Sequence, residues 1–193
     1  MYIYIVRHGH ETDGFRGGWS QLGLDDIGIK QAESAAAFFK ESYKNIRISS
    51  IYSSDLNRAL QTATIISNTI GVPITTLKSF REVNNGELAG MPNETANELF
   101  PNLFWKGLEW EQNYPNGESP KEFYNRIKSE WDIFLKTVKA HDENTILVTH
   151  GGVIQIIFSL LKNTKYSNKN NYISIGCCDI IRIEYNTAEE SYS

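Results

Sequence analysis

Two short segments of this chain each place a histidine directly before a glycine. Val6-Arg7-His8-Gly9 ends one run of β-branched and aromatic residues, and Val148-Thr149-His150-Gly151 ends another. Such runs predict strands that are buried on both faces, and the carboxyl ends of such strands are where open α/β sheets place their ligands. An imidazole at that edge can be a nucleophile, an acid, a base or a metal ligand. The guanidinium of Arg7 suits a phosphate or a carboxylate.

Each histidine, taken alone, could equally be a structural residue that closes a strand. Both precede glycine at a strand end, however, and two adjacent parallel strands would bring the imidazoles of His8 and His150 face to face. The backbone N–H groups of a helix that starts at Gly151 would favour an anion in the same space. Arg58, one turn into a predicted helix, and Glu82, after a predicted strand, belong to the same edge. Together these groups describe a phosphate site with an acid beside it.

The composition bounds the class of protein. The chain has 193 residues, 40% of them hydrophobic and 22% charged, which is ordinary for a globular protein. A net charge of -4 argues against a nucleic-acid partner, and no apolar run is long enough to span a membrane. The cysteines, Cys177 and Cys178, are adjacent and form no disulfide framework. We therefore expect a cytoplasmic protein without nucleic-acid or membrane partners.

Strand and helix patterns alternate along the chain. Asp25 or Asp26 can cap a helix that ends at about Tyr43, Ser54 can cap a second, and Ser119 begins a third with a capping box. We expect helices over 26–43, 55–70, 120–141 and 151–161, short helices near 94–100 and 103–112, strands over 2–6, 47–53, 74–77, 145–149, 172–175 and 179–185, and a frayed tail over 186–193. The alternation predicts a single domain over 1–193, an α/β three-layer sandwich whose mostly parallel sheet carries helices on both faces.

The segment 84–117 differs from the rest of the chain because it is rich in glycine, proline and aromatic residues. We expect a small helical and loop excursion that forms a lid over the carboxyl edge of the sheet and the active site. Its aromatic side chains could form a satellite core or line the mouth of a pocket. The segment has one basic residue, Lys106, against five glutamates, and this balance favours a weakly charged organic ligand. The aromatic residues concerned are Phe104, Trp105, Trp110 and Tyr114.

The sequence resembles the histidine phosphatase superfamily, in its phosphoglycerate-mutase-like branch, over nearly the whole chain. A lone Arg-His-Gly would be weak evidence, but five matching segments occur in the family's order. They are VRHGH at Val6–His10, YSSDLNRALQTA at Tyr52–Ala63, FREVNNGELAG at Phe80–Gly90, NGES at Asn116–Ser119 and LVTHGG at Leu147–Gly152.

The resemblance implies a catalytic role for five side chains. His8 would attack the phosphoryl group and become phosphohistidine, which water then hydrolyses. Arg7 and Arg58 would hold the phosphoryl oxygens, and His150 would donate to the same group. Glu82 would protonate the leaving oxygen and then activate water.

The resemblance also implies that the backbone N–H of Gly151 contacts the phosphate, and that no metal or organic cofactor is needed. The sequence departs from the family pattern at His10, where the family usually has glutamate or glutamine. The family's asparagine a few residues later has no clear counterpart, and Gly14 stands near its place. No role is assigned to His10, Glu11 or Thr12.

Some site assignments have competitors. Arg58 alone could be a surface residue, and Glu87 and Glu118 lie in the same neighbourhood as Glu82; the resemblance favours Glu82. A metal site is the main rival interpretation, but Arg7 and Arg58 would repel a cation. Its ligands would be His8, His10, Glu11, Asp13 and His150.

These observations predict a phosphomonoester phosphatase that acts on small organic phosphate esters through phosphohistidine. The alternative is a cofactor-dependent phosphoglycerate mutase, which would need more basic residues for a multiply anionic substrate than 84–117 supplies. A non-catalytic module that binds phosphometabolites or phosphoproteins ranks lower, because the nucleophile and the clamp are both present. Sugar phosphates, nucleotide monophosphates and cofactor precursors such as α-ribazole phosphate all stay open as substrates, and no oligomeric state is predicted.

Overall fold

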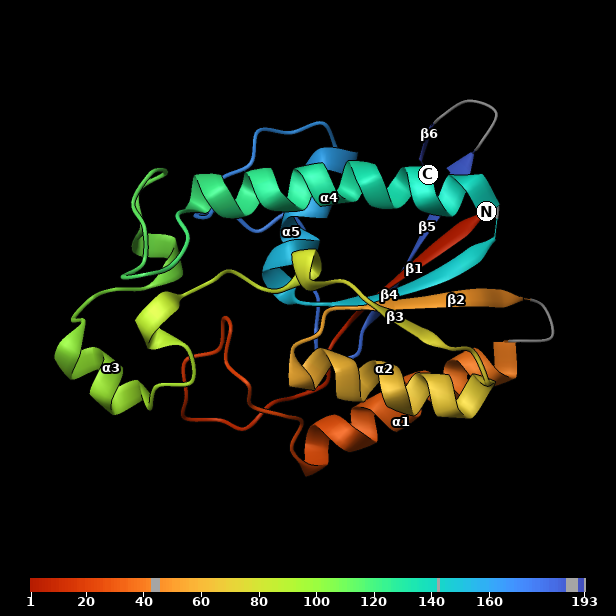
Figure 1. The fold of residues 1–193 in the computed structure, drawn as a ribbon, viewed down its shortest axis with the longest axis horizontal. Coiled ribbons are helices and arrows are strands. Elements are labelled where there is room, and N and C mark those ends of the chain that lie inside the picture. Colours follow the sequence, from red (N-terminus) through yellow and green to blue (C-terminus); the bar gives the residue numbers. More distant parts are fainter. Residues whose placement is uncertain (43–45, 142, 187–190, 193) are drawn as a thin grey trace.

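A computed structural model describes residues 1–42, 46–141, 143–186 and 191–192 (Figure 1). Tyr43, where we expected the first helix to end, lies outside the described residues, as do 187–190 and 193 of the predicted tail. The sheet has the order β3-β2-β4-β1-β5-β6. Its strands are β1 (Tyr2–Arg7), β2 (Ile48–Ser53), β3 (Ile74–Thr76), β4 (Asn144–Thr149), β5 (Ile180–Asn186) and β6 (Ser191–Tyr192).

The sheet lies between two layers of helices. Strands β1 to β4 pair in parallel, whereas β5 runs antiparallel to β1 and β6 antiparallel to β5. Helices α1 (Asp26–Ser42) and α2 (Asn57–Ile70) cover one face, and α4 (Pro120–His141) and α5 (Gly151–Leu161) cover the other, while α3 (Asn93–Leu99) lies away from the sheet (Figure 1). The predicted three-layer α/β architecture is confirmed.

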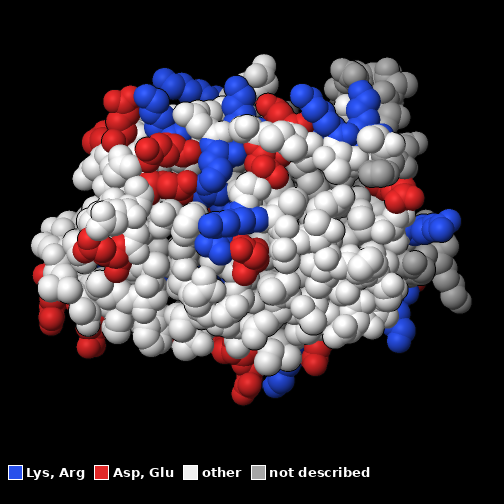
Figure 2. Space-filling model, in the orientation of Figure 1, with Lys and Arg blue, Asp and Glu red and all other residues white. Residues whose placement is uncertain are grey.

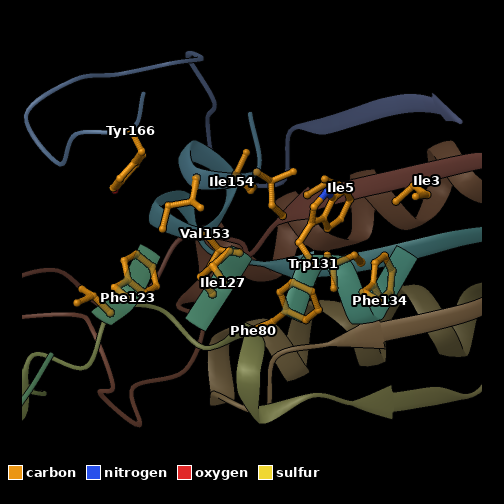
Figure 3. Packing of buried hydrophobic residues seen from close by; sticks show 14 of the residues in the cluster. Ile3, Ile5, Phe80, Phe123, Ile127, Trp131, Phe134, Val153, Ile154 and Tyr166 are labelled. Carbon is orange, nitrogen blue, oxygen red and sulfur yellow. The ribbon is translucent and has the colours of Figure 1, made fainter. Parts of the chain in front are cut away.

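Each face of the sheet has its own apolar core, as expected for strands buried on both sides. The core under α1 and α2 includes Tyr4, Val6, Phe39 and Ile66. The core under α4 and α5 is larger, and Figure 3 shows side chains of both helices meeting those of β1. The residues of this second core labelled there are Ile3, Ile5, Phe80, Phe123, Ile127, Trp131, Phe134, Val153, Ile154 and Tyr166.

The parallel pairing of β1 with β4 positions the two histidines. Arg7 lies opposite Thr149 in the register, so His8 and His150 leave the sheet at equivalent points. Gly9 then packs directly against α1. A Cβ atom on Gly9 would lie 2.5 Å from the carbonyl oxygen of Gly28, so only glycine fits there.

Local signals predict two helix starts correctly and one wrongly. Asp25 caps α1, because its Oδ1 accepts a 2.8 Å hydrogen bond from the Gly28 N–H. The Ser119 capping box is confirmed, with Glu122 Oε2 accepting from the Ser119 N–H at 2.9 Å. Ser54, however, does not cap α2, which begins at Asn57. Its hydroxyl instead lies 2.8 Å from Nε2 of His150.

Two predicted elements do not form as expected in the described residues. The helix expected over 103–112 is reduced to one 3-10 turn, Trp105–Gly107. Asn168 explains this, since its side-chain amide donates to the carbonyl oxygens of Trp105 and Leu108, holding both in an irregular loop. The strand expected over 172–175 does not form either.

In place of a strand ladder, side chains satisfy the backbone of 172–175. The carboxamide of Gln155 accepts from the Tyr172 and Ile173 N–H groups and donates to the Ile173 carbonyl oxygen. Arg7 donates to the carbonyl oxygen of Ile175 at 2.8 Å. Side-chain hydrogen bonds thus replace the pairing that a strand would need.

The surface is mixed in charge. On the face in Figure 2, Lys and Arg side chains are interspersed with Asp and Glu along α4, so the described residues of this face form no continuous basic surface. None of the described helices combines the length and the apolar character needed to cross a lipid bilayer.

Candidate active site

His8 lies at the centre of the carboxyl edge and is 5% exposed. Its Nδ1 is 2.7 Å from the carbonyl oxygen of Gly9, which can only accept, so Nδ1 carries the hydrogen. Its Nε2 accepts a 3.2 Å hydrogen bond from Nε of Arg58. Burial, reinforced by the Arg58 charge, lowers the pKa of His8 to about 3. The imidazole is therefore neutral near pH 7, with an unprotonated Nε2 beside Arg58.

Arg58 comes from the first turn of α2 and is 1% exposed. Its guanidinium donates to the carbonyl oxygen of Gly18 at 2.8 Å and to that of Ser20 at 3.3 Å. These bonds fasten the loop 13–24 to the site. The sequence predicts the position of Arg58 beside His8, and the structure brings the two together.

His150 faces His8, with ring centroids 5.0 Å apart. Burial lowers the pKa of His150 well below its usual value, and the nearby Arg58 charge adds to this effect, so this imidazole is also neutral. Nε2 bonds the Ser54 hydroxyl, while Nδ1 is buried without a hydrogen-bond partner among the described residues. When the Ser54 hydroxyl donates, Nδ1 carries a hydrogen that is free to bind an anion.

Arg7 ends β1 and directly precedes His8. One nitrogen of its guanidinium is committed to Ile175, but Nε is buried without a hydrogen-bond partner in the described chain. Its guanidinium lies close to Gly151, where an added Cβ would be 3.6 Å from Nε. Two guanidinium groups and an imidazole N–H thus lie near His8, an arrangement suited to a tetrahedral anion.

Glu82 lies at the N-terminus of α5. Its Oε2 accepts a 2.9 Å hydrogen bond from the Gly152 N–H, and its Oε1 accepts from the Val83 N–H at 3.1 Å. A Cβ on Gly152 would collide with this carboxyl group, so glycine is required for the close approach. Of the competitors, Glu118 is ion-paired with Arg126 at 2.7 Å, and Glu87 is exposed.

Arg126 is a residue that the sequence interpretation missed. From α4 it donates to the backbone carbonyl oxygens of Ser79, Arg81 and Glu82, and so fixes the turn that presents the Glu82 carboxyl group. A signal was available, because Arg126 flanks the buried stripe of α4 that contains Phe123 and Ile127. A charged residue beside such a stripe needs partners in the interior.

Glu11, whose role was left open, also points into the site. Its Oε2 lies 3.5 Å from Nε of Arg58 and has no hydrogen-bond partner among the described residues. Burial raises the pKa of Glu11, against the opposing effect of the Arg58 charge. A partly buried carboxylate therefore lies beside the cation that would bind an anionic ligand.

The residues of the rival metal interpretation separate into different contacts. His10 Nδ1 is 2.7 Å from Asp25 Oδ2 and its Nε2 is 3.5 Å from Asp13, while Glu11 and His150 have the contacts described above. Within the described residues, no three or more His, Cys, Asp or Glu side chains are grouped so that they could hold a metal ion.

A cavity of about 520 Å³ opens beside Glu82 and Gly152, between the loop 13–24 and the segment 84–117. Phe104, Trp105 and Tyr114 line it, as predicted for the mouth of a pocket. Tyr114 and Trp105 also pack with the core under α4 and α5, so the two predicted roles coexist. Trp110 lies instead in a second aromatic cluster, 5.9 Å from Tyr124 between ring centroids. The charge balance predicted from 84–117 alone left out one cation of the cavity. Arg16, which belongs to the loop 13–24, lines the same cavity as Lys106.

Residues 3–192 match the sequence model of the histidine phosphatase superfamily, branch 1. The chain belongs to this superfamily of enzymes.

Two relatives and one solved structure illustrate its range. "Putative phosphoserine phosphatase 2" of Hydrogenobacter thermophilus is 31% identical over 86% of this chain and 81% of its own length. "Probable phosphoglycerate mutase GpmB" of Yersinia pestis is 29% identical over 96% of this chain and 85% of its own length. The α-ribazole phosphatase of Shigella flexneri, 19% identical, has the same fold, with a TM-score of 0.81 over all of this chain and 94% of that one.

The Glu11 carboxylate generates a prediction about anion binding. Glu11→Gln removes a negative charge beside Arg58 while keeping the side chain's shape, so inorganic phosphate should inhibit the enzyme about threefold to tenfold more strongly. Because burial raises the pKa of Glu11, the wild type should approach the variant as the pH falls and Glu11 is protonated. Inhibition constants measured across a pH series check this.

Glu98→Gln, an exposed acid on α3, is the matched control and should leave phosphate inhibition unchanged. Weaker inhibition in Glu11→Gln would mean that the carboxylate holds Arg58 in place for the anion, and would contradict the repulsive role.

Proposed function

We propose that the protein is a phosphomonoester phosphatase that works through a phosphohistidine at His8. One observation carries the proposal: a buried neutral imidazole keeps its Nε2 unprotonated beside the anion-binding guanidinium of Arg58. A nucleophilic histidine must be unprotonated on the attacking nitrogen, and the Gly9 carbonyl oxygen selects that tautomer.

The surrounding groups suit phosphoryl transfer. Arg7 and Arg58 would bind the equatorial oxygens and neutralise the charge that spreads over them in the transition state. The Nδ1 hydrogen of His150, and the backbone N–H of Gly151, would donate to the same oxygens. The site residues for phosphate are thus Arg7, Arg58, His150 and Gly151, with no metal or cofactor in the reaction.

Glu82 is the proposed acid. Fixed by two backbone N–H groups at the edge of the cavity, its carboxyl group faces the place where the leaving alcohol would lie. It would protonate the leaving oxygen, and then take a proton from the water that hydrolyses phosphohistidine. The segment 84–117, which forms a wall of that cavity, would act as a lid within a single domain.

The alternative function is that of a cofactor-dependent phosphoglycerate mutase, the activity after which one of the relatives is named. It would require phosphohistidine to phosphorylate the free hydroxyl of a bound phosphoglycerate and His8 then to take back the other phosphoryl group. The bisphosphate formed in between needs firm binding of a second phosphate. A non-catalytic binding module is less well supported, because the nucleophile, clamp and acid are all in position. The two free cysteines fit a reducing compartment, so we infer a cytoplasmic enzyme.

The first test traps the intermediate. During turnover of a labelled phosphomonoester in excess EDTA, an alkaline quench and mass spectrometry should find phosphate on His8, because the neutral Nε2 attacks phosphorus. His8→Ala should carry no label and lose nearly all activity. His10→Ala, which removes the neighbouring imidazole, should still be labelled at His8.

Full activity in His8→Ala, or a loss in EDTA that zinc restores, would contradict the mechanism. The label should also leave as inorganic phosphate. Isomerisation of 3-phosphoglycerate in the presence of 2,3-bisphosphoglycerate, faster than phosphate release, would identify a mutase instead.

The second test separates an acid from a structural carboxylate at Glu82. Alkyl phosphates leave as basic alkoxides and need a proton, so Glu82→Gln should slow their phosphoryl transfer about 10²–10⁴-fold. p-Nitrophenyl phosphate leaves as a stabilised phenolate and should be affected much less in burst kinetics, which isolate the first step.

Glu87→Gln, an exposed acid on the neighbouring turn, is the control and should behave like the wild type on both esters. Equal slowing of both esters by Glu82→Gln would show that Glu82 is not the acid.

A further inference from the structure

The cavity beside Glu82 is more cationic than the segment that forms most of its wall. Arg16 enters from the loop 13–24, and Lys106 comes from the segment itself. Among the described lining residues Glu82 is the one acid, and it is already assigned to the leaving oxygen. A ligand that fills the cavity therefore meets two positive charges beyond the phosphate clamp.

Arg16 is held in place before any ligand arrives. Its backbone N–H donates to the carbonyl oxygen of Met91 at 2.8 Å, and its carbonyl oxygen accepts from the Gly90 N–H at 2.9 Å. Its guanidinium carbon lies 4.4 Å from the ring centroid of Phe104, and Nη2 donates to Oδ1 of Asn97 at 2.7 Å. Backbone, stacking and side-chain contacts thus fix one face and one end of the group.

The remaining edge of the guanidinium is unsatisfied. Nε of Arg16 is buried and has no hydrogen-bond partner among the described residues. A buried donor without a partner destabilises the free protein by about 1–3 kcal/mol, so such groups are uncommon and indicate a missing acceptor. An anionic oxygen in the cavity would supply that acceptor.

Tyr114 lines the same cavity as Arg16 and Glu82. Its side chain is 7% exposed, and burial raises the pKa of its hydroxyl to about 12, with Arg16 and Glu82 both close enough to influence it. The hydroxyl is therefore a neutral donor near pH 7.

We propose that Arg16 is a specificity residue that binds a carboxylate on the leaving alcohol, which makes phosphate esters of small hydroxy acids the preferred substrate class. This inference rests on the proposed phosphatase function. Phosphate would lie between Arg7, Arg58 and His150, and the carboxylate would pair with the open edge of Arg16, with Lys106 at the rim. Aromatic rings of Phe104 and Trp105 would enclose the short carbon chain between them.

Two pairs of substrates test the carboxylate directly. O-Phosphoserine differs from O-phosphoethanolamine only by a carboxylate, and 3-phosphoglycerate has a carboxylate where glycerol 3-phosphate has a hydroxymethyl group. The wild type should favour the carboxylated member of at least one pair by about tenfold or more in kcat/KM, as expected for a charge-assisted hydrogen bond. Arg16→Gln should abolish that preference.

The controls separate binding from folding. Arg16→Gln should change kcat/KM for p-nitrophenyl phosphate less than about threefold, because that ester has no carboxylate. Arg16→Lys should restore part of the preference, since it keeps the charge but loses the forked donor. Arg47→Gln, an exposed arginine that does not line the cavity, should keep the full preference.

The outcomes distinguish this inference from the proposed function. If the wild type hydrolyses none of the five esters, the phosphatase function itself fails. If p-nitrophenyl phosphate is hydrolysed but neither pair shows a carboxylate preference, or the preference survives in Arg16→Gln, the role of Arg16 is overturned.

Discussion

The active site depends on one buried cation, the guanidinium of Arg58. A lone charge in a protein interior costs several kcal/mol unless it is paired and hydrogen-bonded. Arg58 is 1% exposed and obtains its partners from the carbonyl oxygens of Gly18 and Ser20, from Nε2 of His8 and from the nearby carboxylate of Glu11. The two carbonyl partners fix the loop 13–24 over the site, and the Arg58 charge adds to burial in keeping His8 neutral.

This arrangement separates two tasks that one side chain could not perform together. A protonated imidazole would bind phosphate but could not attack it, whereas a neutral one needs other groups to attract the anion. Here Arg7 and Arg58 provide the charge, and burial keeps His8 and His150 uncharged. In the proposed mechanism the donors are in place before the substrate binds, so little reorganisation would oppose the transition state.

The sequence predicted most of the features that depend on residues close together in the chain, such as the strand ends that carry the two histidines. His8 and His150 could be placed because each ends a buried strand before a glycine, and the register of β1 and β4 brings them together. Glu11 and Arg16 could not be assigned, because their partners come from segments distant in the chain. The strand expected over 172–175 was wrong for the same reason, since a distant glutamine and arginine satisfy its backbone. Local patterns determine strand ends and helix caps, whereas side-chain partners depend on tertiary contacts.

The protonation state of His8 tests the central claim most directly. Two-bond ¹H–¹⁵N spectra of protein labelled at histidine nitrogens, with His8 assigned by comparison with His8→Gln, report both the charge and the tautomer. The structure predicts a neutral ring with hydrogen on Nδ1 and a bare Nε2 throughout the range from about pH 5 to about pH 8, because its pKa is lowered to about 3. A ring that titrates near its ordinary pKa of about 6.5, or one with hydrogen on Nε2, would contradict the account.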